Sequence, residues 1–297
     1  MTRPVPSPPP EHHHQGAAPA LDALPQEVVA VSTDALAAGF HEVDATSTVQ
    51  ANRQWWDIEA ESYYQEHGEF LGDAELVWGP EGWTERELGL LGELQDTLSL
   101  EVGAGAAQGS RYVRSQGARA IASDISGGML GKSRQIDADL GQPPLPLVLA
   151  DGCALPFADE TFDLVFSAYG AVPFVADSAL LMRECARVLR PGGRFVFSTT
   201  HPIRWAFPDS PGPDGLTATM SYFNRTPYVE TADGELVYAE HHRTLGDRVR
   251  EIIAAGLRLV DLVEPEWPER TTSSWGGWSP LRGQSIPGTA IFVCTRE

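Results

Sequence analysis

Short β-type runs alternate along this chain with segments of helical periodicity, and this alternation restricts the possible folds more than any other feature. A repeat of strand, helix and strand is typical of a parallel sheet, because the crossover helix returns the chain to the end of the sheet where the previous strand began. Five β-type runs, which end at residues 102, 124, 150, 167 and 198, alternate with helical segments in this way, and two more, LRLVDLV and AIFVC, follow later. We therefore expect a doubly wound α/β sheet of seven strands with helices on both faces.

Two regions depart from this pattern. Residues 1–48 are rich in Pro and Ala and show no sustained period, which predicts a disordered tail before a domain over 49–297. Residues 202–243 form a long, aromatic-rich insertion between the fifth strand and a helix that begins at Thr244 with a capping-box pattern. We interpret the insertion as a cover over the substrate. A satellite core of its own is an equally good interpretation.

Composition indicates the cellular compartment of the protein and whether it binds metal or enters a membrane. The chain has no apolar run of about 18 residues, and its first residues lack the layout of a signal peptide. Its three cysteines form no CxxC pair, which suits reduced thiols better than disulfides and gives no support to a metal site. The sequence thus predicts a cytoplasmic protein that neither binds metal nor enters a membrane.

The charge balance bears on the partner. Forty-one acidic and 21 basic side chains give a formal charge of −20. A surface of that sign repels phosphate backbones. We therefore expect a small-molecule substrate rather than nucleic acid, while the oligomeric state stays open.

A glycine turn follows the first strand of the alternating region, in the segment SLEVGAGAAQG. Gly103 and Gly105 let a ligand approach the backbone, although such turns serve dinucleotides, methyl donors and plain tight turns alike. Glu101 distinguishes between these ligands. A carboxylate about 5 Å from a pyrophosphate would weaken binding by roughly 3 kcal/mol through charge repulsion at an effective dielectric near 20. A dinucleotide site would also place a glycine at Gln108. Glu101 therefore favours a cationic ligand.

A second acid, Asp124, ends the next strand about 20 residues further on. At that position an acid accepts hydrogen bonds from a ribose diol in nucleotide-binding sheets. Asp124 is also a good N-cap for the helix that follows, so both roles remain open.

Three segments, EVGAGAAQG, ADGCALPFADETFDLVFSAYG and RECARVLRPGGRFVFSTTHP, keep an order and spacing that resemble the class I S-adenosylmethionine-dependent methyltransferases, in particular the type 11 methyltransferase domain. The resemblance covers roughly residues 97–200 well, and 56–63 and 242–259 more loosely. Ala107 replaces the third glycine of the family motif, which leaves a methyl group near the methionine part of the donor.

The resemblance implies a Rossmann-like sheet whose last strand is antiparallel, and S-adenosylmethionine as the cofactor. In such a site Glu101, Gly103 and Gly105 surround the methionine part, and Asp124 binds the ribose. The crevice at the carboxyl ends of the strands also brings Ser167 near the ligand. The remaining positions implied are Ile125, Met129, Asp151, Gly152 and Cys153 around the adenine, and Tyr63 in a helix that closes over the donor.

Methyl transfer is an in-line displacement from a sulfonium, so the enzyme mainly aligns acceptor and donor. A general base matters only when the acceptor must lose a proton. His201, after the fifth strand, is the first candidate base, with loop anchoring as its alternative role. Two rival functions remain: an NAD(P)-dependent oxidoreductase on a related fold, and a protein that binds S-adenosylmethionine without catalysis.

Overall fold

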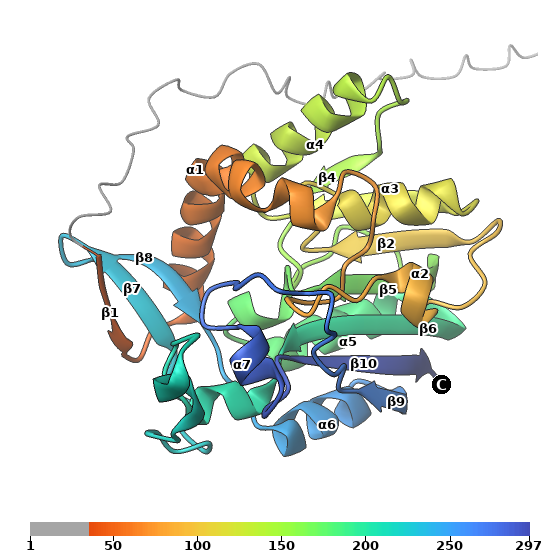
Figure 1. Ribbon diagram of the computed structural model, residues 1–297. Coiled ribbons are helices and arrows are strands. Elements are labelled where there is room, and N and C mark those ends of the chain that lie inside the picture. Colours follow the sequence, from red (N-terminus) through yellow and green to blue (C-terminus); the bar gives the residue numbers. More distant parts are fainter. Residues whose placement is uncertain (1–35) are drawn as a thin grey trace, which may run out of the picture. The chain divides into compact units, whose positions relative to one another are not determined.

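The computed structural model describes residues 36–297 (Figure 1). Most of the predicted tail, residues 1–35, lies outside the described residues. Residues 36–48, which we also assigned to the tail, instead form a strand and the start of a long helix. Among the described residues, no helix has the length and apolar character needed to cross a bilayer.

The central element is a seven-stranded sheet with strand order β4, β3, β2, β5, β6, β10, β9. The last strand along the chain, β10, runs antiparallel to both of its neighbours, whereas the other pairings are parallel. This confirms the predicted sheet. The strands are β2 (Leu98–Val102), β3 (Arg119–Asp124), β4 (Leu147–Leu149), β5 (Phe162–Ala168), β6 (Leu189–Thr200), β9 (Leu257–Val263) and β10 (Thr289–Arg296).

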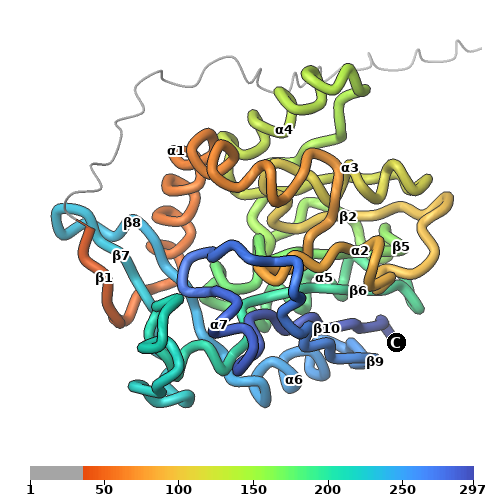
Figure 2. The backbone as a smooth tube through the Cα atoms, viewed as in Figure 1, coloured from red at the N-terminus to blue at the C-terminus, as the bar shows by residue number. Residues whose placement is uncertain are grey.

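Alternate residues of each strand enter two separate cores, because successive side chains point to opposite faces of a sheet. In β6, Phe195 and Phe197 pack with α5 (Ser178–Val188) and α6 (Leu245–Ala254). Val196, between them, belongs to the core that includes Tyr112 of α3 (Gln108–Ser115). Helices thus cover both faces, as expected for a parallel sheet. Figure 2 shows α6 beside β9 at one edge of the sheet, and Figure 1 shows α4 (Gly127–Asp139) beside β4 at the other.

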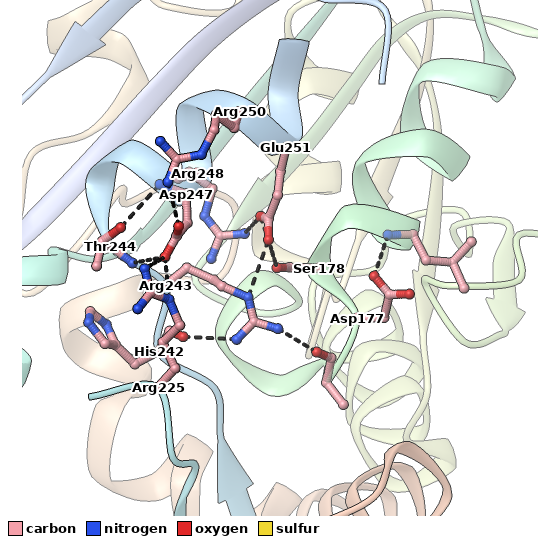
Figure 3. Close-up of polar contacts among 12 residues, drawn as sticks. Asp177, Ser178, Arg225, His242, Arg243, Thr244, Asp247, Arg248, Arg250 and Glu251 are labelled. Carbon is pink, nitrogen blue, oxygen red and sulfur yellow. Dashed lines mark hydrogen bonds and ion pairs between the residues drawn. The ribbon is translucent and has the colours of Figure 1, made fainter. Parts of the chain in front are cut away.

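Polar contacts fix α6 against α5 (Figure 3). The predicted capping box is present: Thr244 Oγ1 accepts from the Asp247 amide at 3.1 Å, and the Asp247 carboxylate accepts from the Thr244 amide at 3.2 Å. One turn later, the Glu251 carboxylate accepts from Ser178 Oγ at 2.9 Å and from Arg248 at 2.7 Å. The helix is therefore oriented by its own N-terminus and by the first residue of α5.

A second, smaller sheet has the antiparallel order β1, β7, β8. Its strands are β1 (Leu36–Phe40), β7 (Tyr228–Ala232) and β8 (Glu235–Glu240), so the insertion contributes a hairpin and the N-terminal segment adds a strand to it. The part of the insertion before this hairpin contains two short helices, η3 (Pro202–Ala206) and η4 (Pro213–Leu216). The small sheet and α1 (Ala45–Leu71) lie beside the carboxyl end of β2 (Figure 1). Two further short helices are α2 (Glu85–Leu88) and α7 (Pro280–Gly283).

The turns after β2 and β5 touch through their backbones. Gly103 has a φ of 66°, which favours glycine, and a Cβ on Gly170 would lie 1.8 Å from the carbonyl oxygen of Gly103. No side chain fits at either position. The contact fixes the spacing of the two turns at the carboxyl edge of the sheet.

We expect Gly170→Ala to lower the free energy of unfolding by about 2–4 kcal/mol, because the new methyl group must displace backbone rather than a flexible side chain. Gly131→Ala is the matched control: it lies within α4, nothing lies within 4 Å of the added Cβ, and the change should stabilise by up to about 1 kcal/mol. Urea unfolding of both variants measures the difference. Equal stability of Gly170→Ala and the parent chain would contradict the contact.

Candidate functional site

A cavity of about 380 Å³ lies at the carboxyl ends of β2, β3, β4 and β5, where ligands bind in open α/β sheets. The glycine turn, α1, β8 and the loop at residues 275–278 close it. Most of the predicted site residues line this cavity together. They are Tyr63, Glu101, Gly103, Gly105, Asp124, Ile125, Met129, Asp151 and Gly152.

Three predicted residues do not line the cavity. Cys153 donates its amide to Asp151 Oδ1 at 2.8 Å, and its thiol points to the backbone of Asp177. Ser167 is 1% exposed, because the pleat of β5 directs it to the same covered face of the sheet as Val165. Its Oγ has no hydrogen-bond partner among the described residues.

His201 is the third. Its Nδ1 accepts the Ile203 amide at 3.1 Å, and its Nε2 lies 2.7 Å from Glu264 Oε1. Both ring nitrogens are thus occupied, and burial lowers the pKa of the imidazole. The side chain caps η3 and is 6% exposed. This geometry matches the loop-anchoring role, and His201 is not among the residues that line the cavity.

Glu101 is buried at the end of β2, with 4% of its surface exposed. Its Oε2 accepts from Ser110 N at 2.7 Å and from Ser110 Oγ at 2.6 Å, at the N-terminal turn of α3. Burial nevertheless raises the pKa of this carboxyl to about 7. A cationic ligand in the cavity would therefore favour the ionised form.

Asp124 holds the glycine turn. Its Oδ2 accepts from Gly105 N at 2.7 Å and its Oδ1 from Ser126 N at 2.8 Å, while burial raises the pKa of the carboxyl to about 6. The sequence left ribose binding and helix capping open for Asp124. The N-cap of α4 is instead Ser126, whose Oγ accepts from the Met129 amide at 3.0 Å. Asp124 is thus placed between the turn and the cavity.

Ala107, at the third motif position, has a φ of 60° and is fully buried. Its methyl group packs in the core with α3 and does not line the cavity. The expected methyl group beside the donor is therefore absent from the cavity wall. A left-handed conformation explains why glycine suits this position.

Helix α1 covers the cavity and is fastened to the N-terminus of α4. Asp57 Oδ1 accepts from Ser126 Oγ at 2.7 Å and from Gly128 N at 2.9 Å. A Cβ on Gly128 would lie 2.5 Å from the Asp57 carbonyl oxygen, so the two helices meet closely. This attachment places Trp56 and Tyr63 in the cavity wall. Nothing in the sequence pattern around Asp57 indicates its role.

Asn52 joins α1 to the small sheet. Its Nδ2 donates to the carbonyl oxygens of Phe174 at 3.0 Å and Ala239 at 2.9 Å, and its Oδ1 accepts from the Ala239 amide at 2.8 Å. The side chain is 2% exposed. These bonds hold β8 at the mouth of the crevice, with Tyr238 and Glu240 in the cavity wall.

Tyr169 lines the cavity at the end of β5, with a φ of 60°. Its hydroxyl lies 2.8 Å from Thr289 Oγ1, which donates to Glu81 Oε2 at 2.5 Å. Glu81 lies in the loop between α1 and α2, and no sequence pattern around it indicates this role. This buried chain of contacts fixes the Tyr169 side chain.

Cavity residues that the sequence did not identify as site residues come from the insertion and from a late loop: Arg204, Asp209, Tyr238, Glu240, Trp275 and Trp278. They meet only through tertiary contacts, and no motif or spacing connects them. In the described part of the chain, no group of three His, Cys, Asp or Glu residues is arranged to hold a metal ion.

Comparison with known proteins bears on the family and the fold of this chain. The model of a family described as a methyltransferase domain matches residues 100–197. A demethylmenaquinone methyltransferase of Streptomyces griseus is 37% identical over 203 residues, which cover 65% of this chain and 74% of the relative. A second one, from a Mycobacterium species (strain KMS), is 38% identical over 120 residues, or 39% of this chain. In that relative the match spans about half of the length, 49%.

Among solved structures, the chain is similar to a 1,6-didemethyltoxoflavin-N1-methyltransferase of Burkholderia thailandensis, determined with bound 1,6-didemethyltoxoflavin and S-adenosylhomocysteine. The TM-score is 0.54 at 16% identity, over 90% of this chain and 98% of the other. At this identity the likeness concerns the fold alone.

We expect Glu101→Gln to stabilise the ligand-free protein at pH 8. The folded-state pKa of Glu101, about 7, lies above its ordinary value of 4.5, so folding favours the protonated carboxyl. The contribution of this group to the free energy of unfolding is therefore fully present below pH 4.5 and is lost as pH rises through 7. The amide carries no charge, so the variant should be more stable than the parent at pH 8 by up to about 3 kcal/mol. Urea unfolding at pH 8 and pH 5 measures this.

Glu93→Gln is the control, because Glu93 is exposed and should change stability by less than about 0.5 kcal/mol. A Glu101→Gln protein less stable than the parent at pH 8 would contradict the burial argument.

Proposed function

This chain belongs to the class I S-adenosylmethionine-dependent methyltransferases, and we propose that it transfers the methyl group of S-adenosylmethionine to a small organic acceptor bound in the same cavity. The observation that carries the proposal is the joint placement of Glu101, the glycine turn and Asp124 around one cavity of about 380 Å³.

The walls of the cavity suit the donor. A Cβ on Gly105 would meet only the flexible end of Met129, so the turn leaves room for a ligand against its backbone. Glu101 would attract the cationic part of the donor, Asp124 and Asp151 offer carboxylates to its ribose and adenine, and Ile125 and Met129 offer apolar contacts to the ring. The donor carries its methyl group on a sulfonium. The thioether that leaves after transfer needs no proton. The protein therefore acts mainly by alignment.

The acceptor side supports a small molecule. The insertion supplies Arg204, Asp209 and the β8 side chains to a cavity that the long helix α1 also covers. We propose that residues 202–243 act as the substrate cover. The acidic lining and the formal charge of −20 make a phosphate backbone a poor ligand.

The cysteines bear on the cellular setting. Cys153, Cys185 and Cys294 are all free, and Cys185 and Cys294 are buried. Free thiols suit a reducing compartment, so we propose that the protein works in the cytoplasm.

Titration calorimetry with S-adenosylmethionine, S-adenosylhomocysteine, NADH and NADPH in parallel tests the donor. We expect saturable binding of the first two alone. Asp124→Ala and Asp151→Ala should each weaken donor binding by about 1–3 kcal/mol through lost hydrogen bonds, while Asp139→Ala, at an exposed position of α4, should not. Binding of a nicotinamide cofactor alone, or unchanged affinity in both site variants, would refute the assignment.

Donor affinity should also depend on pH. Because the pKa of Glu101 in the ligand-free protein is about 7 and that of Asp124 about 6, both carboxyls take up protons as pH falls from 8 to 5.5. We expect the Kd for S-adenosylmethionine to rise by about tenfold or more over this range. Glu101→Gln should bind more weakly at pH 8 and flatten the profile. A profile of Glu101→Gln as steep as that of the parent would assign the dependence to another group.

A further inference from the structure

The cavity wall carries more negative than positive groups. Six carboxyl side chains line the cavity, whereas Arg204 is the only Lys or Arg among the lining residues in the described part of the chain. The guanidinium of Arg204 lies 3.0 Å from Asp209 Oδ1, so this positive charge is already paired. Such a wall attracts ligands that carry positive charge. The six carboxyl groups belong to Glu75, Glu101, Asp124, Asp151, Asp209 and Glu240.

Glu240 is the carboxyl for which the donor and the neighbouring arginines do not account. Glu75 pairs with Arg86 at 2.9 Å. Asp209 pairs with Arg204, and the other three carboxyl groups are those that we assign to the donor. Burial raises the pKa of the Glu240 carboxyl, and the neighbouring Arg204 opposes this rise only in part. A positive group of a ligand beside Glu240 would favour its ionised form.

Aromatic rings line the cavity in a continuous row that begins next to Glu240. The ring centres of Tyr238 and Phe174 lie 5.8 Å apart, and those of Phe174 and Trp56 lie 5.7 Å apart. Tyr63 continues the row at 5.3 Å from Trp56. The interplanar angles along the row are 64°, 72° and 89°, so consecutive rings do not share a plane. Several aromatic rings set at steep angles around one space are suited to bind an ammonium group through their faces.

The carboxyl group and the rings meet on β8. Tyr238 and Glu240 lie two positions apart in this strand and therefore point to the same face, and the Tyr238 hydroxyl donates to Glu240 Oε1 at 2.6 Å. Ala239 between them is fully buried, and Asn52 of α1 binds its amide and its carbonyl oxygen. These contacts fix the two side chains before a ligand arrives, which lowers the entropic cost of binding.

Other classes of acceptor fit this wall less well. The carboxyl groups would repel an acceptor that enters as an anion, and the one arginine in the wall is already paired. A neutral acceptor would leave the buried Glu240 carboxylate without a counter-charge. An acceptor with an ammonium group gains from the carboxylate and from the faces of the rings together.

Resting on the proposed function, we propose that the acceptor carries an ammonium group, and that this group is bound by Glu240 and by the aromatic row of Tyr238, Phe174 and Trp56. The ammonium group serves for binding only, since its nitrogen has no free electron pair to accept a methyl group. The acceptor is therefore a small organic cation that takes the methyl group on another of its atoms.

Three probes of the same shape test the preference for charge. Choline has a quaternary nitrogen, dimethylbutanol has a carbon atom in its place, and dimethylbutanoate adds a negative charge instead. Calorimetry with protein saturated with S-adenosylhomocysteine gives their affinities. We expect choline to bind at least about tenfold more tightly than dimethylbutanol, and dimethylbutanoate to bind most weakly.

Equal affinities for choline and dimethylbutanol, or no saturable binding of choline, overturn the proposal. Binding of S-adenosylhomocysteine is measured first. A protein that does not bind it contradicts the proposed function, whereas a protein that binds it and fails to prefer choline contradicts only the class of acceptor.

Two variants locate the binding of the cation. Glu240→Gln removes the charge at nearly constant shape, so we expect it to weaken choline binding by about tenfold and to leave dimethylbutanol and S-adenosylhomocysteine unaffected. Phe174→Leu keeps the charge and removes one ring, and it should weaken choline binding by about threefold or more. Glu235→Gln, exposed on the same hairpin, is the control and should bind choline as the parent does.

Unchanged choline affinity in Glu240→Gln overturns the role of the carboxylate. An equal loss of choline and dimethylbutanol in that variant does the same, because a charge effect must act on the cation alone. Unchanged choline affinity in Phe174→Leu overturns the role of the aromatic row.

Discussion

The contact between the backbones of Gly103 and Gly170 is the constraint on which the rest of the site depends. It brings the turns after two adjacent strands, β2 and β5, together without an intervening side chain. The glycine turn then lies where the Asp124 carboxylate can accept a hydrogen bond from the Gly105 amide, and Tyr169 lies in the wall of the same cavity. A side chain at either glycine would separate these groups, because backbone atoms cannot move aside as the end of a side chain can.

Burial of acids gives this site its chemical character. Glu101, Asp124 and Glu240 all have pKa values raised by desolvation, although each accepts hydrogen bonds. In the absence of a ligand, such groups lower the stability of the folded protein at neutral pH, and a cation or a transferable proton relieves the penalty. The same groups thus explain both the cost of ionising the buried carboxyls and the positively charged ligand that the site favours.

The cover over the cavity comes from segments far apart in the chain. Asp57 fastens α1 to α4, and Asn52 fastens it to β8. The strand β1 extends the hairpin of the insertion from the other side. Each of these contacts joins residues more than 60 positions apart, whereas the wall formed by the glycine turn and Asp124 comes from consecutive strands and turns.

The sequence by itself predicted the seven strands of the central sheet, the antiparallel last strand through its family resemblance, and most of the residues that line the cavity at the strand ends. These depend on local periodicity and on short motifs whose residues are close in the chain. It did not reveal β1, whose five residues become a strand only by pairing with β7. Nor did it predict that His201 caps η3, that Ser167 is buried against a covered face of the sheet, or that Glu240 lines the cavity. Tertiary structure decided these, since a side chain's direction and the partners of its polar atoms are set by packing between distant segments.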